Sequence, residues 1–164
     1  MGITITDYCR VDQRVAELGC LYPDGIALLP ENFDTPRDRG ELLQRTSGTT
    51  LRKAFRAEKL PVVEVLPASE RIPYITYKHF EWVIPTLFIS ASVISENPVA
   101  VSIALSVVAN FITDFLKGIP TAKNIKLNIV VEKRLDRTCK KINYDGDVAG
   151  LSSLAEIIKE ISDD

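Results

Sequence analysis

The sequence predicts an α+β fold: a mixed or antiparallel sheet of about four to five strands, with a central apolar helical hairpin and a C-terminal helix packed on it. Three observations predict this fold. The stretch from Trp82 to Lys117 is strongly apolar and is divided by the polar turn Glu96-Asn97-Pro98. Apolar and polar residues then alternate from Ile125 to Val131, which is the period of a strand. Apolar residues recur at helical spacing from Leu151 to Ile161.

The length and composition are those of one globular domain. A chain of 164 residues with 46% hydrophobic and 26% charged residues is long enough to build one core. We expect a single domain over 1–164, with helical and loop segments at 1–60, strands at 61–81, the apolar helical hairpin at 82–117, a β-hairpin at 124–144 and the C-terminal helix at 147–162. Charged residues appear by Asp7 and Arg10, before an apolar signal segment can form, so the expected location is the cytoplasm.

The remaining elements are expected to be short. Apolar residues at helical spacing place a helix from Asp7 to Leu18, and Gly19 ends it. Three apolar segments are expected to form strands: Ile26–Leu29, Pro61–Leu66 and Pro73–Lys78. The most regular strand pair is antiparallel, at 125–131 and 138–144, and is joined by a charged turn at 133–137.

The apolar stretch is expected to form two helices, because proline favours the first turn of a helix. They run from Pro85 to Ser95 and from Pro98 to Lys117. One stripe of the second helix is polar: Ser102, Ser106, Asn110, Thr113 and Lys117. Another stripe is apolar: Val101, Leu105, Val108, Ile112 and Phe115. This division is typical of a core helix with one edge in water.

The same stretch leaves open a membrane-inserting hairpin. Basic side chains flank its two outer ends while its turn carries only Glu96, which follows the positive-inside tendency: Lys78, His79, Lys117 and Lys123. The first apolar run is shorter than the about 20 residues that a membrane span needs, and Asp114 is costly in hydrocarbon. The lengths therefore favour a buried hairpin, with membrane association through Trp82 to Lys117 as the alternative.

The three cysteines, Cys9, Cys20 and Cys139, are far apart in the sequence and form no CxxC motif. This pattern predicts reduced thiols rather than a disulfide framework or a zinc site. Cys139 lies between Arg137 and Lys140, two charges of the kind that can lower the pKa of a thiol. A catalytic thiol also needs a base, and the only histidine is His79. A packed or surface histidine is the favoured interpretation.

A basic region offers a candidate binding surface for a partner or for phosphate. Between Arg45 and Lys59 five positive residues stand against one negative residue, Glu58, which gives a net charge of +4. The five are Arg45, Arg52, Lys53, Arg56 and Lys59. A helix is expected from Leu51 to Leu60, and a helix-turn-helix-like arrangement would place most of these charges on one face. No aromatic residue is interleaved for base stacking, so nucleic acid is not the favoured partner.

Two blocks of opposite charge follow each other near the C-terminus. Residues 123–141 carry seven positive and two negative side chains, a net +5, and residues 142–164 carry one positive and six negative, a net −5. The blocks would attract each other within one molecule or between copies. Head-to-tail self-association that weakens as salt rises is the sharper of the two hypotheses.

One segment resembles the spacing of a calcium-binding loop. Its candidate ligands occupy the first, third and twelfth positions: Asp145, Asp147 and Glu156. The fifth position is Ala149, and the segment 138–144 is expected to be a strand rather than an entering helix. Helix capping explains the same residues better, with Asp147 or Ser153 as N-cap and Glu156 completing a capping box with Ser153. No metal site is therefore expected.

The sequence predicts a non-enzymatic protein-interaction or regulatory module that acts through self-association or through a partner protein. Two alternatives stay open. One is the membrane-inserting protein described above, and the other is a small carboxylate-dependent hydrolase or nuclease with residues such as Asp34, Glu64 or Asp145. No cofactor is expected, and the sequence identifies no small-molecule ligand.

Overall fold

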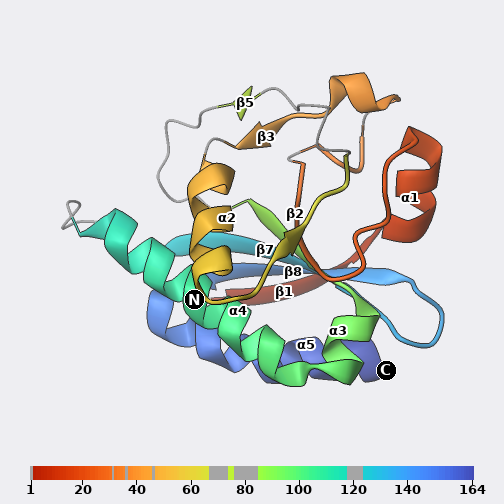
Figure 1. The fold of residues 1–164 in the computed structure, drawn as a ribbon. Coiled ribbons are helices and arrows are strands. Elements are labelled where there is room, and N and C mark those ends of the chain that lie inside the picture. The colour runs from red at the N-terminus through yellow and green to blue at the C-terminus, as the bar shows by residue number, and fades with distance from the viewer. Residues whose placement is uncertain are drawn as a thin grey trace.

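The computed structural model describes residues 2–30, 32–35, 37–45, 47–66, 74–75, 85–117 and 124–164. Its main feature is a six-stranded mixed sheet with the strand order β1-β8-β7-β6-β2-β4 (Figure 1). The six strands are β1 (Gly2–Tyr8), β2 (Ile26–Leu29), β4 (Val62–Val63), β6 (Thr86–Ile89), β7 (Ile125–Glu132) and β8 (Cys139–Gly146). The N-terminal strand β1 forms one edge of this sheet and β4 forms the other.

Two parallel strand pairs, β6 with β7 and β2 with β4, interrupt an otherwise antiparallel sheet. Parallel neighbours need a crossover connection, because a tight turn cannot join them. The helices α3 (Ala91–Glu96) and α4 (Pro98–Leu116) make the crossover from β6 to β7. The helix α2 (Ser47–Ala57) lies in the crossover between β2 and β4.

One face of the sheet carries most of the helices. There α3, α4 and α5 (Leu154–Asp163) lie together, and a 3-10 helix (Val148–Ser153) leads into α5 (Figure 1). Leu127 and Ile129 of β7 pack in this core with Phe55 of α2, Val108 of α4 and Ile158 of α5, and each of these side chains is at most 1% exposed. The α+β fold predicted from the sequence, with helices and a C-terminal helix packed on a mixed sheet, is confirmed.

The opposite face has a smaller core built around α1 (Val11–Leu18). Val11 and Val15 pack there with Phe88 of β6 and Val130 of β7, and all four are buried. Gly19 ends α1 in the left-handed conformation with φ 67°, as the sequence predicts.

The prediction of a helix from Pro85 to Ser95 is wrong in its first half. Residues Thr86–Ile89 form β6, and α3 begins only at Ala91. Because β6 is covered on both faces and lies between β2 and β7, its sequence is continuously apolar and lacks the alternation that identifies a strand. Residues 82–84 lie outside the described residues.

The second helix of the apolar stretch agrees with its predicted pattern. Val101, Leu105, Val108 and Ile112 are buried, whereas Ser102, Ser106, Asn110 and Thr113 are exposed. The side chain of Phe115 is outside the described part. Among the described helices, α4 included, none combines the length and the apolar character that a membrane span requires.

The predicted start of the first helix is also wrong. The helix expected from Asp7 begins at Val11, and Asp7 and Tyr8 belong to β1 instead. This strand comes in addition to the expected ones. Ile3 and Ile5 alternate with Thr4 and Thr6, but such a brief alternation is a weak signal beside the stronger helical pattern that follows it.

The predicted β-hairpin is confirmed as β7 and β8, and the C-terminal helix follows it. Asp147 caps the 3-10 helix by accepting a hydrogen bond from the Gly150 N–H at 2.9 Å. The capping box between Ser153 and Glu156 is wrong. The Ser153 hydroxyl instead donates to the Gly150 carbonyl at 2.7 Å, and its backbone is already helical.

The two middle strand predictions are only partly met. The segment 61–66 contributes the two residues of β4 to the main sheet. Within the segment 73–78, the described residues Tyr74–Ile75 form β5, which pairs with β3 (Gln44–Arg45) in a separate two-stranded sheet. The other residues of 73–78 lie outside the described part of the chain.

Candidate functional site

The outer side of β1 is a long open sheet edge. All seven residues from Gly2 to Tyr8 pair with β8, in a register that runs from Gly2 opposite Asp145 to Tyr8 opposite Cys139. In the part of the chain that the structure describes, no strand pairs with the other side of β1. An edge strand presents a row of backbone N–H and C=O groups to any strand that approaches it. The edge of β1 is therefore a candidate interaction surface.

Apolar side chains accompany this open edge. Ile3 lies opposite Tyr144 and Ile5 lies opposite Ile142, so both isoleucines lie on the sheet face that carries α4 and α5. Ile142 and Tyr144 are buried, but Ile3 is 40% exposed and Ile5 is 47% exposed. The helical layer covers β8 and leaves the side chains of β1 in contact with solvent.

The charges beside the open edge are paired locally. Asp7, the only charged residue of β1, forms an ion pair with Lys140 of β8, and this hydrogen-bonded lysine lowers the pKa of the Asp7 carboxyl. The ammonium group of Lys141 lies 5.8 Å from the centroid of the Tyr8 ring. The edge therefore presents a nearly neutral strand, with no excess of either charge to attract an oppositely charged partner.

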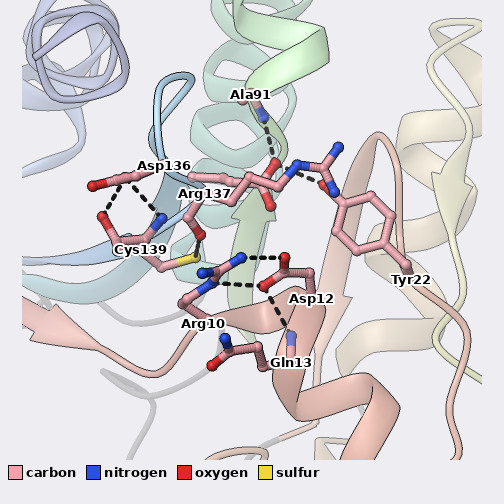
Figure 2. Close-up of polar contacts among 10 residues, drawn as sticks. Arg10, Asp12, Gln13, Tyr22, Ala91, Asp136, Arg137 and Cys139 are labelled. Atoms are coloured by element: carbon pink, nitrogen blue, oxygen red, sulfur yellow. Dashed lines mark hydrogen bonds and ion pairs between the residues drawn. The ribbon is translucent and has the colours of Figure 1, made fainter.

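A second candidate site surrounds a buried carboxylate at the end of β7. Glu132 is 1% exposed, and its Oε1 atom accepts hydrogen bonds from the Tyr22 hydroxyl at 2.6 Å and from the Ala91 N–H at 3.0 Å. Its Oε2 atom has no hydrogen-bond partner among the described residues. Figure 2 shows Arg137 beside Tyr22, and the guanidinium carbon lies 5.3 Å from the ring centroid.

This polar cluster joins three segments of the chain: the loop before β2, the start of α3 and the end of β7. Burial, followed by the hydrogen bond to Glu132, raises the pKa of Tyr22 above its usual value, so the phenol stays protonated and donates. Nearby, the Ser92 hydroxyl donates to Asp24. The described residues contain no histidine to activate either hydroxyl as a nucleophile. The hydrogen bonds that Glu132 accepts from Tyr22 and Ala91 tie these three segments together, which is a structural role.

The pKa of Cys139 is not lowered by its charged neighbours in the sequence. Cys139 is 2% exposed, and burial raises the pKa of its thiol to about 12. Figure 2 shows Arg10 near the thiol, and its guanidinium is paired with Asp12, with N–O distances of 3.0 and 2.7 Å. Burial also raises the pKa of the Cys9 thiol, to about 11. His79, the proposed base, lies outside the described residues.

The structure separates the predicted basic surface into different environments. Arg52 turns inward and forms an ion pair with Glu64 at 2.8 Å, whereas Lys53, Arg56 and Lys59 are exposed. Arg45 belongs to β3, and its side chain is not among those described. The helix-turn-helix-like arrangement is wrong, because the elements next to α2 in the chain are strands: β3 precedes it and β4 follows it. Phosphate binding by the exposed residues stays a prediction.

The carboxylates considered for hydrolysis or metal binding do not form a described cluster. Glu64 follows β4 and Asp145 lies on β8, and three strands separate β4 from β8 in the sheet. Asp34 is exposed in the turn after β2. For the calcium hypothesis, Asp147 serves as a helix cap. Among the described residues, no group of three or more His, Cys, Asp or Glu side chains is arranged to hold a metal ion.

The two opposite charge blocks meet within one molecule. Lys133 lies 3.9 Å from Asp164, and Arg134 lies 3.9 Å from Asp163, so the turn after β7 contacts the end of α5. The Arg134 N–H also donates to the Ser162 carbonyl. These contacts are those of the intramolecular hypothesis, and head-to-tail attraction between copies stays a prediction.

Comparisons of the chain with protein-family models, with curated proteins and with solved structures found no match. The candidate sites therefore rest on the geometry of this chain alone.

The sequence pattern gives little indication of either candidate site. The only sequence signal for the β1 edge is the alternation of Ile3 and Ile5 with Thr4 and Thr6. The burial of Glu132 has no sequence signal, since its partners Tyr22 and Ala91 are 110 and 41 residues away. Only the three-dimensional fold brings these groups together.

Proposed function

We propose that this chain is a non-enzymatic protein-interaction module that binds an extended segment of its partner along β1. The observation that carries the proposal is the open edge itself: seven residues long, apolar at Ile3 and Ile5, and without an added strand in the described part of the chain. Strand addition to such an edge is a recurrent mode of protein recognition, because backbone hydrogen bonds supply affinity and alternate side chains supply specificity.

The alternatives have less support. Catalysis by a thiol is disfavoured by the raised pKa of Cys139, and catalysis by paired carboxylates is disfavoured by the distance between β4 and β8 in the sheet. The membrane hypothesis loses its main argument, because Ile89 and Val101 of the apolar stretch are packed in the protein core. Protein recognition requires neither a reactive thiol, nor paired carboxylates, nor a hairpin exposed to lipid.

Affinity capture from the native cells tests the proposal. Immobilised wild-type protein is compared with Ile5→Lys, which adds charge at the open edge, and with the control Leu135→Lys, which adds the same charge at a side chain 77% exposed in the β7–β8 turn. We expect a captured protein that is retained by the wild type and the control and lost by Ile5→Lys. Capture that is equal for all three proteins would refute strand addition at β1.

A further inference from the structure

We infer that the occupant of the β1 edge is a second copy of this chain, paired antiparallel about a two-fold axis at Thr4, so that the two six-stranded sheets become one. This inference rests on the proposed function and names the partner. The segment Ile3-Thr4-Ile5 reads the same in both directions. A two-fold interface joins a surface to itself, so it requires this kind of self-complementarity.

Symmetry restricts the register of such a pairing. In a two-fold antiparallel pair, one residue must lie opposite its own copy. With Thr4 at the axis, Ile3 lies opposite Ile5 of the second copy and Ile5 lies opposite its Ile3. Residues directly opposite each other share one face of a sheet, so four isoleucines gather on the side of α4 and α5. Each partly exposed isoleucine thereby gains an apolar neighbour.

The neighbouring symmetric registers match these side chains less well. With Ile3 at the axis, Ile5 has no opposing residue among those of β1. With Ile5 at the axis, Ile3 lies opposite Asp7, whose carboxylate is already paired with Lys140. The register at Thr4 places the two Asp7 residues at opposite ends of the paired strands. It therefore satisfies the apolar side chains without bringing like charges together.

The charge and shape of the edge also favour a copy of the same strand. Edge strands that avoid association commonly use lysine, proline, a bulge or a very short length. None of these features occurs in β1: its seven residues are GITITDY, and they pair with β8 in an unbroken register. Two copies of a nearly neutral strand do not repel each other electrostatically, so the charge of β1 permits pairing with a second copy.

A contact of one strand per copy is at the small end of specific interfaces, below about 1,200 Å² in total. We therefore expect a dissociation constant in the micromolar range or weaker. Sedimentation equilibrium from about 1 μM to about 1 mM should detect a monomer–dimer equilibrium. Because β1 carries one paired charge, the dissociation constant should change less than about threefold between about 0.05 M and about 0.5 M salt. A contact between the two charge blocks would weaken much more.

Substitutions then locate the contact. Ile5→Lys should weaken dimerisation at least about tenfold, since each dimer contains two substituted sites and lysine opposes edge pairing. Leu135→Lys should leave the dimer unchanged. A dimer that Ile5→Lys leaves intact, or one that dissociates strongly with salt, would overturn the inference.

Cysteine cross-linking tests the register. Thr4→Cys should form a disulfide-linked dimer on mild oxidation, because directly opposite residues have Cα atoms about 4.5 to 5.5 Å apart, within disulfide range. Thr6→Cys, the same change on the same sheet face, should not. Wild-type protein controls for the native thiols. Cross-linking of Thr6→Cys alone, or equally of both variants, would overturn the proposed register.

The two proposals fail in different ways. If the purified protein stays monomeric to about 1 mM while capture from cells still depends on Ile5, the second copy is refuted and strand addition by another protein stands. If neither capture nor dimerisation depends on Ile5, strand addition itself is refuted.

Discussion

The two edges of the sheet differ in length, charge and sequence. The β4 edge has two paired residues, Val62–Val63, is preceded by Pro61 and is followed by Glu64, which forms an ion pair with Arg52 of α2. The β1 edge is seven residues long and has neither proline nor an unpaired charge. Short length, proline and charge are the features that prevent a sheet edge from pairing with another chain. One edge is closed in this sense, and the other is open.

This difference assigns separate roles to separate parts of the molecule. The helices α3, α4 and α5 cover the middle of the sheet and supply most of the buried core, while β1 lies beyond them with its isoleucines partly exposed. Changes in the covered part should alter stability, and changes at the open edge should alter association. The following variants test this separation.

The largest effect on stability is expected for Tyr22→Phe, in the loop before β2. This change removes the 2.6 Å hydrogen bond to Glu132, whose other carboxylate oxygen has no hydrogen-bond partner among the described residues. We expect a loss of about 1–3 kcal/mol in the free energy of unfolding, with unchanged dimerisation. Urea denaturation and sedimentation measure the two quantities. An unfolding free energy within about 0.5 kcal/mol of wild type would contradict the structural role of the cluster.

A smaller effect is expected at the closed edge. Arg52→Met removes the ion pair to Glu64, a residue that is half exposed, so the loss of stability should be below about 1 kcal/mol. Because β4 has only two paired residues, its edge should remain unable to pair with another chain even without this ion pair. Sedimentation of the double variant that combines Arg52→Met with Ile5→Lys tests the β4 edge alone, because Ile5→Lys blocks pairing at β1. A dimer in this double variant would show that the edges are not as different as described.

The smallest effect is expected for Asp7→Asn, and it depends on pH. Lys140 holds the pKa of Asp7 below its usual value of 3.8, so the pair stabilises the folded chain above this pH and the contribution is lost as the pH falls through the lowered pKa. Urea midpoints measured between about pH 5 and about pH 2 should therefore fall slightly less steeply for Asp7→Asn than for wild type. Identical slopes would show that the Asp7–Lys140 pair adds no stability.

The sequence predicts the elements whose period is strong and whose burial is one-sided. The alternation of Ile125, Leu127 and Ile129 identifies β7, and the polar stripe of α4 identifies its solvent-facing side. It does not predict β6, because a central strand covered on both faces is continuously apolar and resembles a buried helix. The local pattern is ambiguous in that case, and only the neighbouring strands resolve it.

The candidate sites depend even more on tertiary structure. The exposure of Ile3 and Ile5 follows from the place of β1 at the end of the strand order, and no property of GITITDY reveals that place. The charge blocks at 123–141 and 142–164 are visible in the sequence, but their contacts at Lys133 and Arg134 with the end of α5 become visible only in the fold. Association between copies through these blocks stays a prediction.

Amide hydrogen exchange of β1 and β4 in the same purified sample tests the central claim most directly. In the monomer, the β1 amides that point away from β8 face solvent and should exchange fast. At about 1 mM protein these amides should exchange markedly more slowly than at about 1 μM, whereas β4 should exchange at the same rate at both concentrations. Exchange of β1 that is independent of concentration, or slowing at β4 in its place, would contradict the open edge as the interaction surface of this protein.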